Sequence, residues 1–194
     1  MRNLTATICL AVALLLSSVG VSLGNDSREA SVASNAVRCS SLYLIATSAF
    51  GADKATAKSL MAVQRLFDGI YSGNAGKQTQ KKITNGMISK RKSDSALKLG
   101  SEYDRNPETI YLLEMNCSLW RQKIVEALQT AKRRGVDPHS IFLTMTDIPT
   151  SASSSNSRWS RSKVFVDLAF SAWTKKGRRT PHQMLQEFMK DLKQ

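Results

Sequence analysis

Four carboxylates close together in the sequence are the residues best suited to acid–base chemistry. Glu102, Asp104, Glu108 and Glu114 surround the start of a long predicted helix. Two carboxylates are enough to cleave a glycan, because one acts as the acid and the other as base or nucleophile. A simpler interpretation is that Glu108 complements the positive end of the helix dipole and that Glu114 lies beside the buried stripe. We therefore assign no catalytic residue, and an envelope-acting hydrolase using carboxylates near Glu102, Glu108 and Glu114 is the alternative.

The two histidines do not indicate a metal site. His139 and His182 each follow a proline at a predicted helix start, in the sequences Asp-Pro-His and Thr-Pro-His, which is a capping context. The sequence has no HExxH segment, no paired-cysteine zinc spacing and no EF-hand loop. It also lacks a nucleophile elbow, a phosphate loop and a glycine-rich dinucleotide turn. We accordingly predict no metal and no cofactor.

Cations are the most abundant functional groups, and the formal net charge is +13. Such an excess attracts an acidic macromolecule or an anionic membrane surface. One group of cations brackets a predicted helix with Trp159 and Trp173, and aromatic rings beside cations suit anionic polymers or lipid interfaces. The alternative is that both tryptophans are core residues and the cations a solvated face. The predicted binding residues are Arg158, Arg161, Lys163, Lys175, Lys176, Arg178 and Arg179.

The first 24 residues are typical of a cleaved signal peptide. They contain an early cation at Arg2, an apolar run from Ile8 to Leu16, and small residues before position 25. The run is too short to span a bilayer comfortably, although an uncleaved signal anchor is the alternative. We therefore expect a periplasmic or secreted protein, and export disfavours nucleic acid as the partner.

Export also determines how the cysteines are interpreted. Cys9 lies in the apolar run and leaves with the signal, so Cys39 and Cys117 remain. An oxidising compartment allows these two residues to pair, and we predict a Cys39–Cys117 disulfide. The alternative is two buried thiols that act as small hydrophobic side chains.

The element that must position most of these groups is a helix predicted over residues 106–135. Asn106 is a capping residue, and Pro107 fits the first helical position. Gly135 supplies the left-handed residue that ends many helices, after a last turn rich in cations. Apolar residues recur in steps of three and four, which predicts one buried face. These are Ile110, Leu113, Cys117, Trp120 or Leu119, Ile124, Leu128 and Ala131.

Other helices are predicted on both sides of this one. Residues 25–35 are small and polar and predict a flexible leader, and residues 36–50 predict the first helix. A second helix follows and is expected to break at residues 72–74. Residues 77–100 favour one interrupted helix or two short ones, with a turn at Asn85 and Gly86 as the alternative.

The C-terminal part adds three further predicted helices. They start near Asp137, Trp159 and Thr180, and a serine-rich loop over residues 150–157 precedes the second of them. The sequence therefore predicts an all-α, single-domain bundle over residues 36–194, with six or seven helices around one long central helix. Charge is abundant and catalytic constellations are missing, so we expect a noncatalytic binding or accessory protein for an acidic partner: an envelope polymer, a lipid surface or a protein.

Overall fold

The protein is built from helices throughout the part of the chain that the structure describes, and the predicted all-α class is confirmed. The computed structural model describes residues 30–51, 53–79, 82–137, 140, 156–179 and 183, and no strand occurs among them. Five helices are found there rather than six or seven, and the helices predicted from Asp137 and from Thr180 lie almost wholly outside the described residues. The five are an N-terminal helix over residues 30–50, α2 (Lys54–Thr79), α3 (Asn85–Arg105), α4 (Pro107–Arg133) and α6 (Asn156–Lys175).

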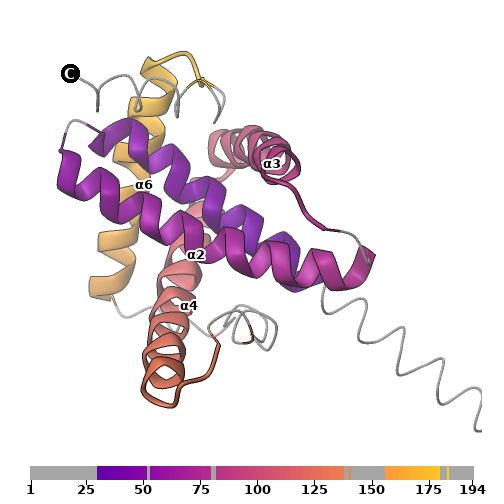
Figure 1. The fold of residues 1–194 in the computed structure, drawn as a ribbon. Coiled ribbons are helices and arrows are strands. Elements are labelled where there is room, and N and C mark those ends of the chain that lie inside the picture. The colour runs from indigo at the N-terminus through magenta and orange to yellow at the C-terminus, as the bar shows by residue number, and fades with distance from the viewer. Residues whose placement is uncertain are drawn as a thin grey trace, which may run out of the picture.

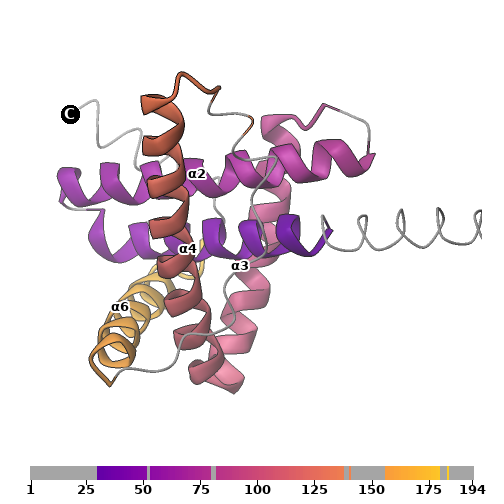
Figure 2. The same cartoon turned by 90° about the horizontal axis from the view of Figure 1, so that it is seen from below.

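The fold is built on an antiparallel pair of helices that α4 crosses (Figure 1). The N-terminal helix and α2 run antiparallel and lie side by side, and α4 crosses them steeply (Figures 1 and 2). α4 also packs against α3 and α6. α4 has 27 residues and α2 has 26, so the expectation of one dominant long helix is replaced by two helices of nearly equal length.

The ends of α4 are those that the sequence predicts. The side chain of Asn106 accepts a hydrogen bond from the Glu108 amide at 3.2 Å, and Pro107 occupies the first turn. At the other end Gly135 has a φ of 66°, and the amide of Val136 donates to the carbonyl of Ala131 at 3.0 Å. This is the Schellman arrangement, which satisfies carbonyls that the helix leaves without partners.

The predicted buried face of α4 is also confirmed. Trp120 is 1% exposed and is therefore the stripe residue, whereas Leu119 is only partly buried. Leu128 packs against the core from its edge. The remaining predicted positions are fully or almost fully buried: Ile110, Leu113, Cys117, Ile124 and Ala131.

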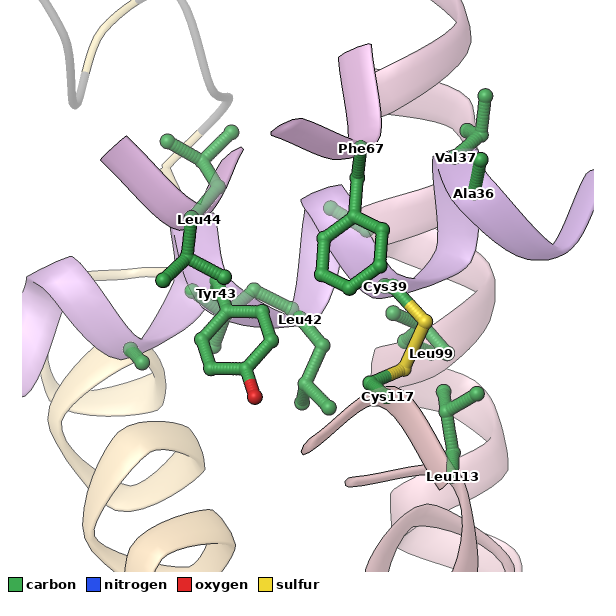
Figure 3. Close-up of a cluster of buried hydrophobic side chains, with 14 of the residues drawn as sticks. Ala36, Val37, Cys39, Leu42, Tyr43, Leu44, Phe67, Leu99, Leu113 and Cys117 are labelled. Atoms are coloured by element: carbon green, nitrogen blue, oxygen red, sulfur yellow. A yellow bond between two sulfur atoms is a disulfide. The ribbon is translucent and has the colours of Figure 1, made fainter. Parts of the chain in front are cut away.

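The predicted disulfide joins the N-terminal helix to α4. The Cys39 and Cys117 sulfur atoms are 2.02 Å apart, and their Cα atoms are 5.6 Å apart. The bond lies within a cluster of apolar side chains that includes Leu42, Phe67 and Leu99 (Figure 3). The two cysteines are thus part of the core as well as a covalent link between two helices.

The N-terminal helix begins earlier than we predicted. Residues 30–35, assigned to the flexible leader, are helical, and Val32 and Ala33 are buried. Their small and polar composition suggested a leader, but the apolar side chains in this segment pack against the rest of the molecule. The helical domain therefore includes residues 30–35.

The predicted break in α2 is wrong, because the helix continues through residues 72–74 to Thr79. Ser72 and Asn74 donate to the carbonyls of Asp68 and Ile70, at 2.8 and 2.9 Å. These polar side chains bond to their own helix instead of ending it. Tyr71 and Ala75 are buried on the same stretch, so packing outweighs the poor helix propensity of the segment.

α3 is one uninterrupted helix, in contrast to the interrupted helix or turn expected over residues 77–100. Thr84 caps its start by accepting from the Met87 amide at 3.3 Å, so Asn85 and Gly86 form its first turn. The helix runs to Arg105, directly before the Asn106 cap of α4. Gly100 allows α6 to approach, because a Cβ atom at this position would lie 2.8 Å from the Trp173 ring.

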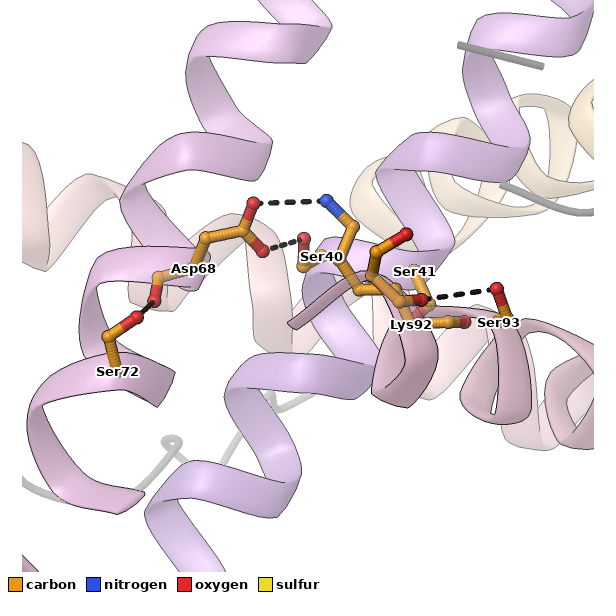
Figure 4. Close-up of polar contacts among 7 residues, drawn as sticks. Ser40, Ser41, Asp68, Ser72, Lys92 and Ser93 are labelled. Carbon is orange, nitrogen blue, oxygen red and sulfur yellow. Dashed lines mark hydrogen bonds and ion pairs between the residues drawn. The ribbon is translucent and has the colours of Figure 1, made fainter. Parts of the chain in front are cut away.

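A partly buried polar network fastens the N-terminal helix, α2 and α3 together. Asp68 of α2 accepts from the Ser40 hydroxyl at 2.7 Å and pairs with the Lys92 ammonium at 3.0 Å (Figure 4). Ser41 donates to the backbone carbonyl of Lys92 at 3.2 Å. The network fixes the position of α3 relative to the N-terminal helix and α2.

Candidate functional site

The seven cations predicted to bind a partner do not form one site. Three of them lie near the start of α6, and four lie at or just beyond its end. At a rise of about 1.5 Å per residue, Arg158 and Lys175 are separated by roughly 25 Å along the helix. The two groups are Arg158, Arg161 and Lys163, and Lys175, Lys176, Arg178 and Arg179. A single ligand-binding centre made from all seven is therefore too long for a compact ligand.

In the group at the start of α6, Lys163 makes contacts within the protein. Lys163 pairs with Asp167 at 2.7 Å, and its ammonium lies 5.1 Å from the centre of the Tyr111 ring. Tyr103 and Tyr111 both donate to the other oxygen of Asp167, at 2.9 and 2.6 Å. We call these four residues, Lys163, Asp167, Tyr103 and Tyr111, the Asp167 cluster. It connects α3, α4 and α6.

Electrostatics in the Asp167 cluster favour the charged carboxylate. Burial by itself disfavours the charged form, but the hydrogen bonds from Lys163, Tyr111 and Tyr103 outweigh this effect and lower the pKa of Asp167. Burial and the hydrogen bond to Asp167 raise the pKa of Tyr111. The cluster is therefore a stable ion pair with two neutral phenols and holds no group poised to exchange a proton near neutral pH.

Among the residues that the structure describes, Glu114 is the one buried carboxylate. It is 9% exposed and accepts from the hydroxyl of Ser162 on α6. Burial raises the pKa of Glu114, although the Ser162 hydrogen bond and the positive charge of Arg121 act in the opposite direction. Tyr43 of the N-terminal helix also hydrogen-bonds to it. Glu114 is thus enclosed between three helices.

The other carboxylates considered for catalysis are dispersed. Glu102 pairs with Arg38 at 2.7 Å, and Asp104 pairs with Arg178 at 2.6 Å. Glu108 is exposed in the first turn of α4, where it complements the helix dipole. A carboxylate pair facing a common substrate is not formed by these residues, so the geometry does not favour the hydrolase alternative.

The group at the end of α6 combines one anchored cation with exposed ones. Arg178 has a φ of 49° and pairs with Asp104, and its guanidinium lies 5.8 Å from the centre of the Trp173 ring. Trp173 is 0% exposed, and its indole N–H donates to the Arg179 carbonyl at 2.9 Å. In contrast, Lys175, Lys176 and Arg179 are exposed.

The tryptophans of α6 support the core interpretation. Trp173 is fully buried, and Trp159 is partly buried with its ring edge-on to Tyr111 at 5.5 Å between centroids. Rings in these positions stabilise α6 against α3 and α4 and are not a surface on which a polymer could stack. Any binding at the end of α6 must therefore depend on charge.

Sequence reasoning missed a groove of about 420 Å³ where the N-terminal helix, α2 and α3 meet. Its walls combine apolar residues with charged residues, and Arg38, Arg91, Lys98, Asp94 and Glu102 are the charged ones. The wall from the N-terminal helix begins at Ala30, in the segment that we assigned to a leader. The apolar residues Val32, Ala33, Ala36 and Val37 are spaced as on one face of a helix. This spacing was the sequence signal that could have predicted the groove wall.

The described residues show neither a metal site nor a membrane-spanning helix. These residues contain no group of three or more histidine, cysteine, aspartate or glutamate side chains placed to hold a metal ion. His139 and His182 lie outside them, as does the predicted signal peptide. None of the described helices has the length and apolar character needed to cross a bilayer. Comparison of the chain with protein-family models, curated proteins and solved structures gives no significant match.

Proposed function

We propose that this protein is an exported, noncatalytic binding or accessory protein that holds an acidic partner through the exposed cations at the end of α6. The observation that carries the proposal is the pairing of Asp104 with Arg178. Because this neighbouring carboxylate is already occupied, it does not neutralise Lys175 and Lys176, for which the described residues provide no ion pair. An acidic polymer, lipid surface or protein would meet a concentrated positive charge there.

Two further observations support the proposal. The Cys39–Cys117 bond is of a kind that persists in oxidising compartments, which agrees with a periplasmic or secreted location after removal of residues 1–24. The carboxylates suited to catalysis are engaged in ion pairs, in a helix start or in the interior. A charged surface is therefore the better supported basis for function.

The experiment compares two charge-reduced variants of the mature protein. The first, Lys175→Gln/Lys176→Gln/Arg179→Gln, leaves Arg178 in place because Arg178 anchors Trp173 and Asp104. The matched control, Lys132→Gln/Arg133→Gln/Arg134→Gln, removes the same charge from the end of α4. We expect the first variant to bind polyglutamate and phosphatidylglycerol vesicles at least tenfold more weakly, with a smaller loss for the control.

Salt dependence provides an independent measurement. Exposed charges are screened over about 8 Å at physiological ionic strength, so binding of the wild type should weaken steeply as salt is added. Capture of components from the exporting organism's envelope then identifies the class of partner. Equal losses in the two variants, or binding that is indifferent to salt, would remove the end of α6 as the binding surface.

A further inference from the structure

The groove between the N-terminal helix, α2 and α3 has two chemically different sides. The N-terminal helix and α2 contribute mainly small and apolar side chains, which include Ala33, Val37, Tyr71 and Ala75, beside the polar side chains of Ser34, Arg38 and Thr79. α3 contributes a polar stripe, because residues separated by three, four and seven positions share one face of a helix. This stripe consists of Arg91, Asp94, Ser95, Lys98 and Glu102. A ligand that fills the groove would therefore need both an alkyl part and a polar part.

The charges on the groove wall leave an excess of one positive charge. Arg38 and Glu102 neutralise each other in an ion pair at 2.7 Å. Arg91 and Lys98 then face a single further carboxylate, Asp94, and all three side chains are exposed. The polar end of a complementary ligand should consequently carry one negative charge.

Ser95 supplies a second and independent indication of a ligand. It lines the groove and is 8% exposed, and its hydroxyl has no hydrogen-bond partner. Neighbouring serines on α3 satisfy their hydroxyls within the helix: Ser93 donates to the Ser89 carbonyl at 3.1 Å and Ser101 to the Leu97 carbonyl at 3.2 Å. The Ser95 oxygen is buried in this conformation, so a polar ligand atom in the groove would reach the hydroxyl after the side chain rotates about its Cα–Cβ bond.

We propose that this groove binds a single-chain aliphatic carboxylate. The carboxylate would lie against the α3 stripe, where Arg91 and Lys98 supply charge and Ser95 donates a hydrogen bond, and the alkyl chain would lie along Ala33, Val37 and Ala75. A volume of about 420 Å³ is in the range of small-molecule sites and is too small to enclose a macromolecule. The inference concerns a different surface from the end of α6 and does not depend on the function proposed there.

The test is calorimetric titration of the oxidised mature protein with decanoate below its micelle concentration. We expect saturable binding of one decanoate per chain. Decanol has the same chain without the charge, and decyltrimethylammonium has the opposite charge, so each should bind at least tenfold more weakly. Equal binding of the three compounds, or binding of phosphatidylglycerol vesicles without binding of decanoate, would overturn the proposal.

Two pairs of variants locate the ligand. Ser95→Ala should weaken decanoate binding several-fold, whereas Ser93→Ala, two residues away with its hydroxyl already bonded to the Ser89 carbonyl, should not. Because Ser95→Ala removes an unpartnered hydroxyl, the melting temperature of the free protein should stay the same or rise, which separates loss of binding from loss of structure. Unchanged binding by the Ser95→Ala variant would overturn the proposed site.

Charge removal provides the second pair. Arg91→Gln/Lys98→Gln should weaken decanoate binding at least tenfold, whereas Lys175→Gln/Lys176→Gln should leave it unchanged. If the α6 pair weakens decanoate binding as much as the α3 pair, overall charge and not the groove explains the affinity, and the proposal fails. The α6 pair also distinguishes the two proposals, since it should affect polyglutamate binding and not decanoate binding.

Discussion

α4 is held to the N-terminal helix and to α6 in different ways. The N-terminal helix is joined to it by the Cys39–Cys117 disulfide, deep in the apolar core. α6 is joined to it by packed aromatic rings and by two carboxylates, Glu114 and Asp167. One contact depends on a covalent bond that is indifferent to protons, and the other includes groups whose charge depends on pH.

The two carboxylates of the α4–α6 contact also differ from each other. Glu114 lies in the interior with a hydroxyl donor from Ser162, so the loss of hydration dominates and its pKa is raised. Asp167 lies near the surface and receives an ammonium and two phenols, so its hydrogen bonds dominate and its pKa is lowered. A carboxylate therefore stabilises or weakens a helix contact according to how many hydrogen-bond donors it has and how deeply it is buried.

The largest effect should come from removing the disulfide. The bond closes a loop with a sequence separation of 78 residues, which in the chain-entropy model stabilises the fold by about 4 kcal/mol. Cys39→Ala/Cys117→Ala should therefore lower the free energy of unfolding measured in urea by an amount of this order. Adding a reductant to the wild type should have a similar effect and should leave the variant unchanged. Coincident unfolding curves for oxidised and reduced wild type would contradict this prediction.

Loss of the Asp167 charge should have the next largest effect. Asp167→Asn removes the negative charge that pairs with Lys163 and leaves one acceptor oxygen in place of two for the three donors of the Asp167 cluster. We expect a loss of about 1–2 kcal/mol at neutral pH, because hydrogen bonds to charged groups are stronger than neutral ones but this pair is partly exposed. Asp94→Asn on the exposed face of α3 is the matched control and should change stability little.

The pH dependence of the Asp167 contribution has a definite sign. Because the folded-state pKa is below the ordinary value of about 3.9, the contribution is fully present above that value and is lost as pH falls through the lowered pKa. The difference between wild type and Asp167→Asn should therefore shrink on acidification. A difference that stays constant down to strongly acidic pH would show that charge is not its origin.

The smallest effect should come from Glu114→Gln. A glutamine keeps an oxygen acceptor for Ser162 without a charge, so we expect a change in the free energy of unfolding below about 1 kcal/mol at neutral pH. In the wild type the Glu114 carboxyl group binds its proton more tightly in the folded state than in the unfolded state. Stability is therefore lost as pH rises from about 4.3, the ordinary value, through the raised pKa.

The variant should show a flatter dependence of stability on pH over that interval than the wild type. Urea unfolding at mildly acidic and at neutral pH measures the difference. Glu126→Gln, an exposed substitution on the same helix, serves as the control and should reproduce the wild-type slope. A Glu114→Gln variant with the wild-type slope would indicate that another group titrates in this range.

Local signals made α4 predictable, whereas α2 shows where such signals fail. Asn106, Pro107 and Gly135 act on the helix that contains or adjoins them, so their meaning does not depend on distant residues. The polar and small residues at 72–74 have weak helix propensity, but burial of Tyr71 and Ala75 depends on chain segments that propensity does not consider.

The two candidate binding surfaces were less predictable for the same physical reason. The cations of α6 are close in the sequence, yet the rise of a helix separates them, and contacts with Asp104 and Asp167 occupy two of them. The groove requires three helices to come together, and one of its walls is a segment with leader-like composition. The cysteine content predicted the disulfide, but only packing shows which cations remain exposed.

The position of the disulfide has a consequence for cleavage of the backbone. Cutting any one peptide bond between Cys39 and Cys117 would leave two pieces that remain a single molecule, because the sulfur–sulfur bond still connects them. α2 and α3 lie entirely within this protected span. α6 lies beyond Cys117, so one cut in the segment before Asn156 would leave it attached by noncovalent contacts alone. The protein thus consists of a covalently closed part and a helix, α6, that a single cut would leave held by noncovalent contacts only.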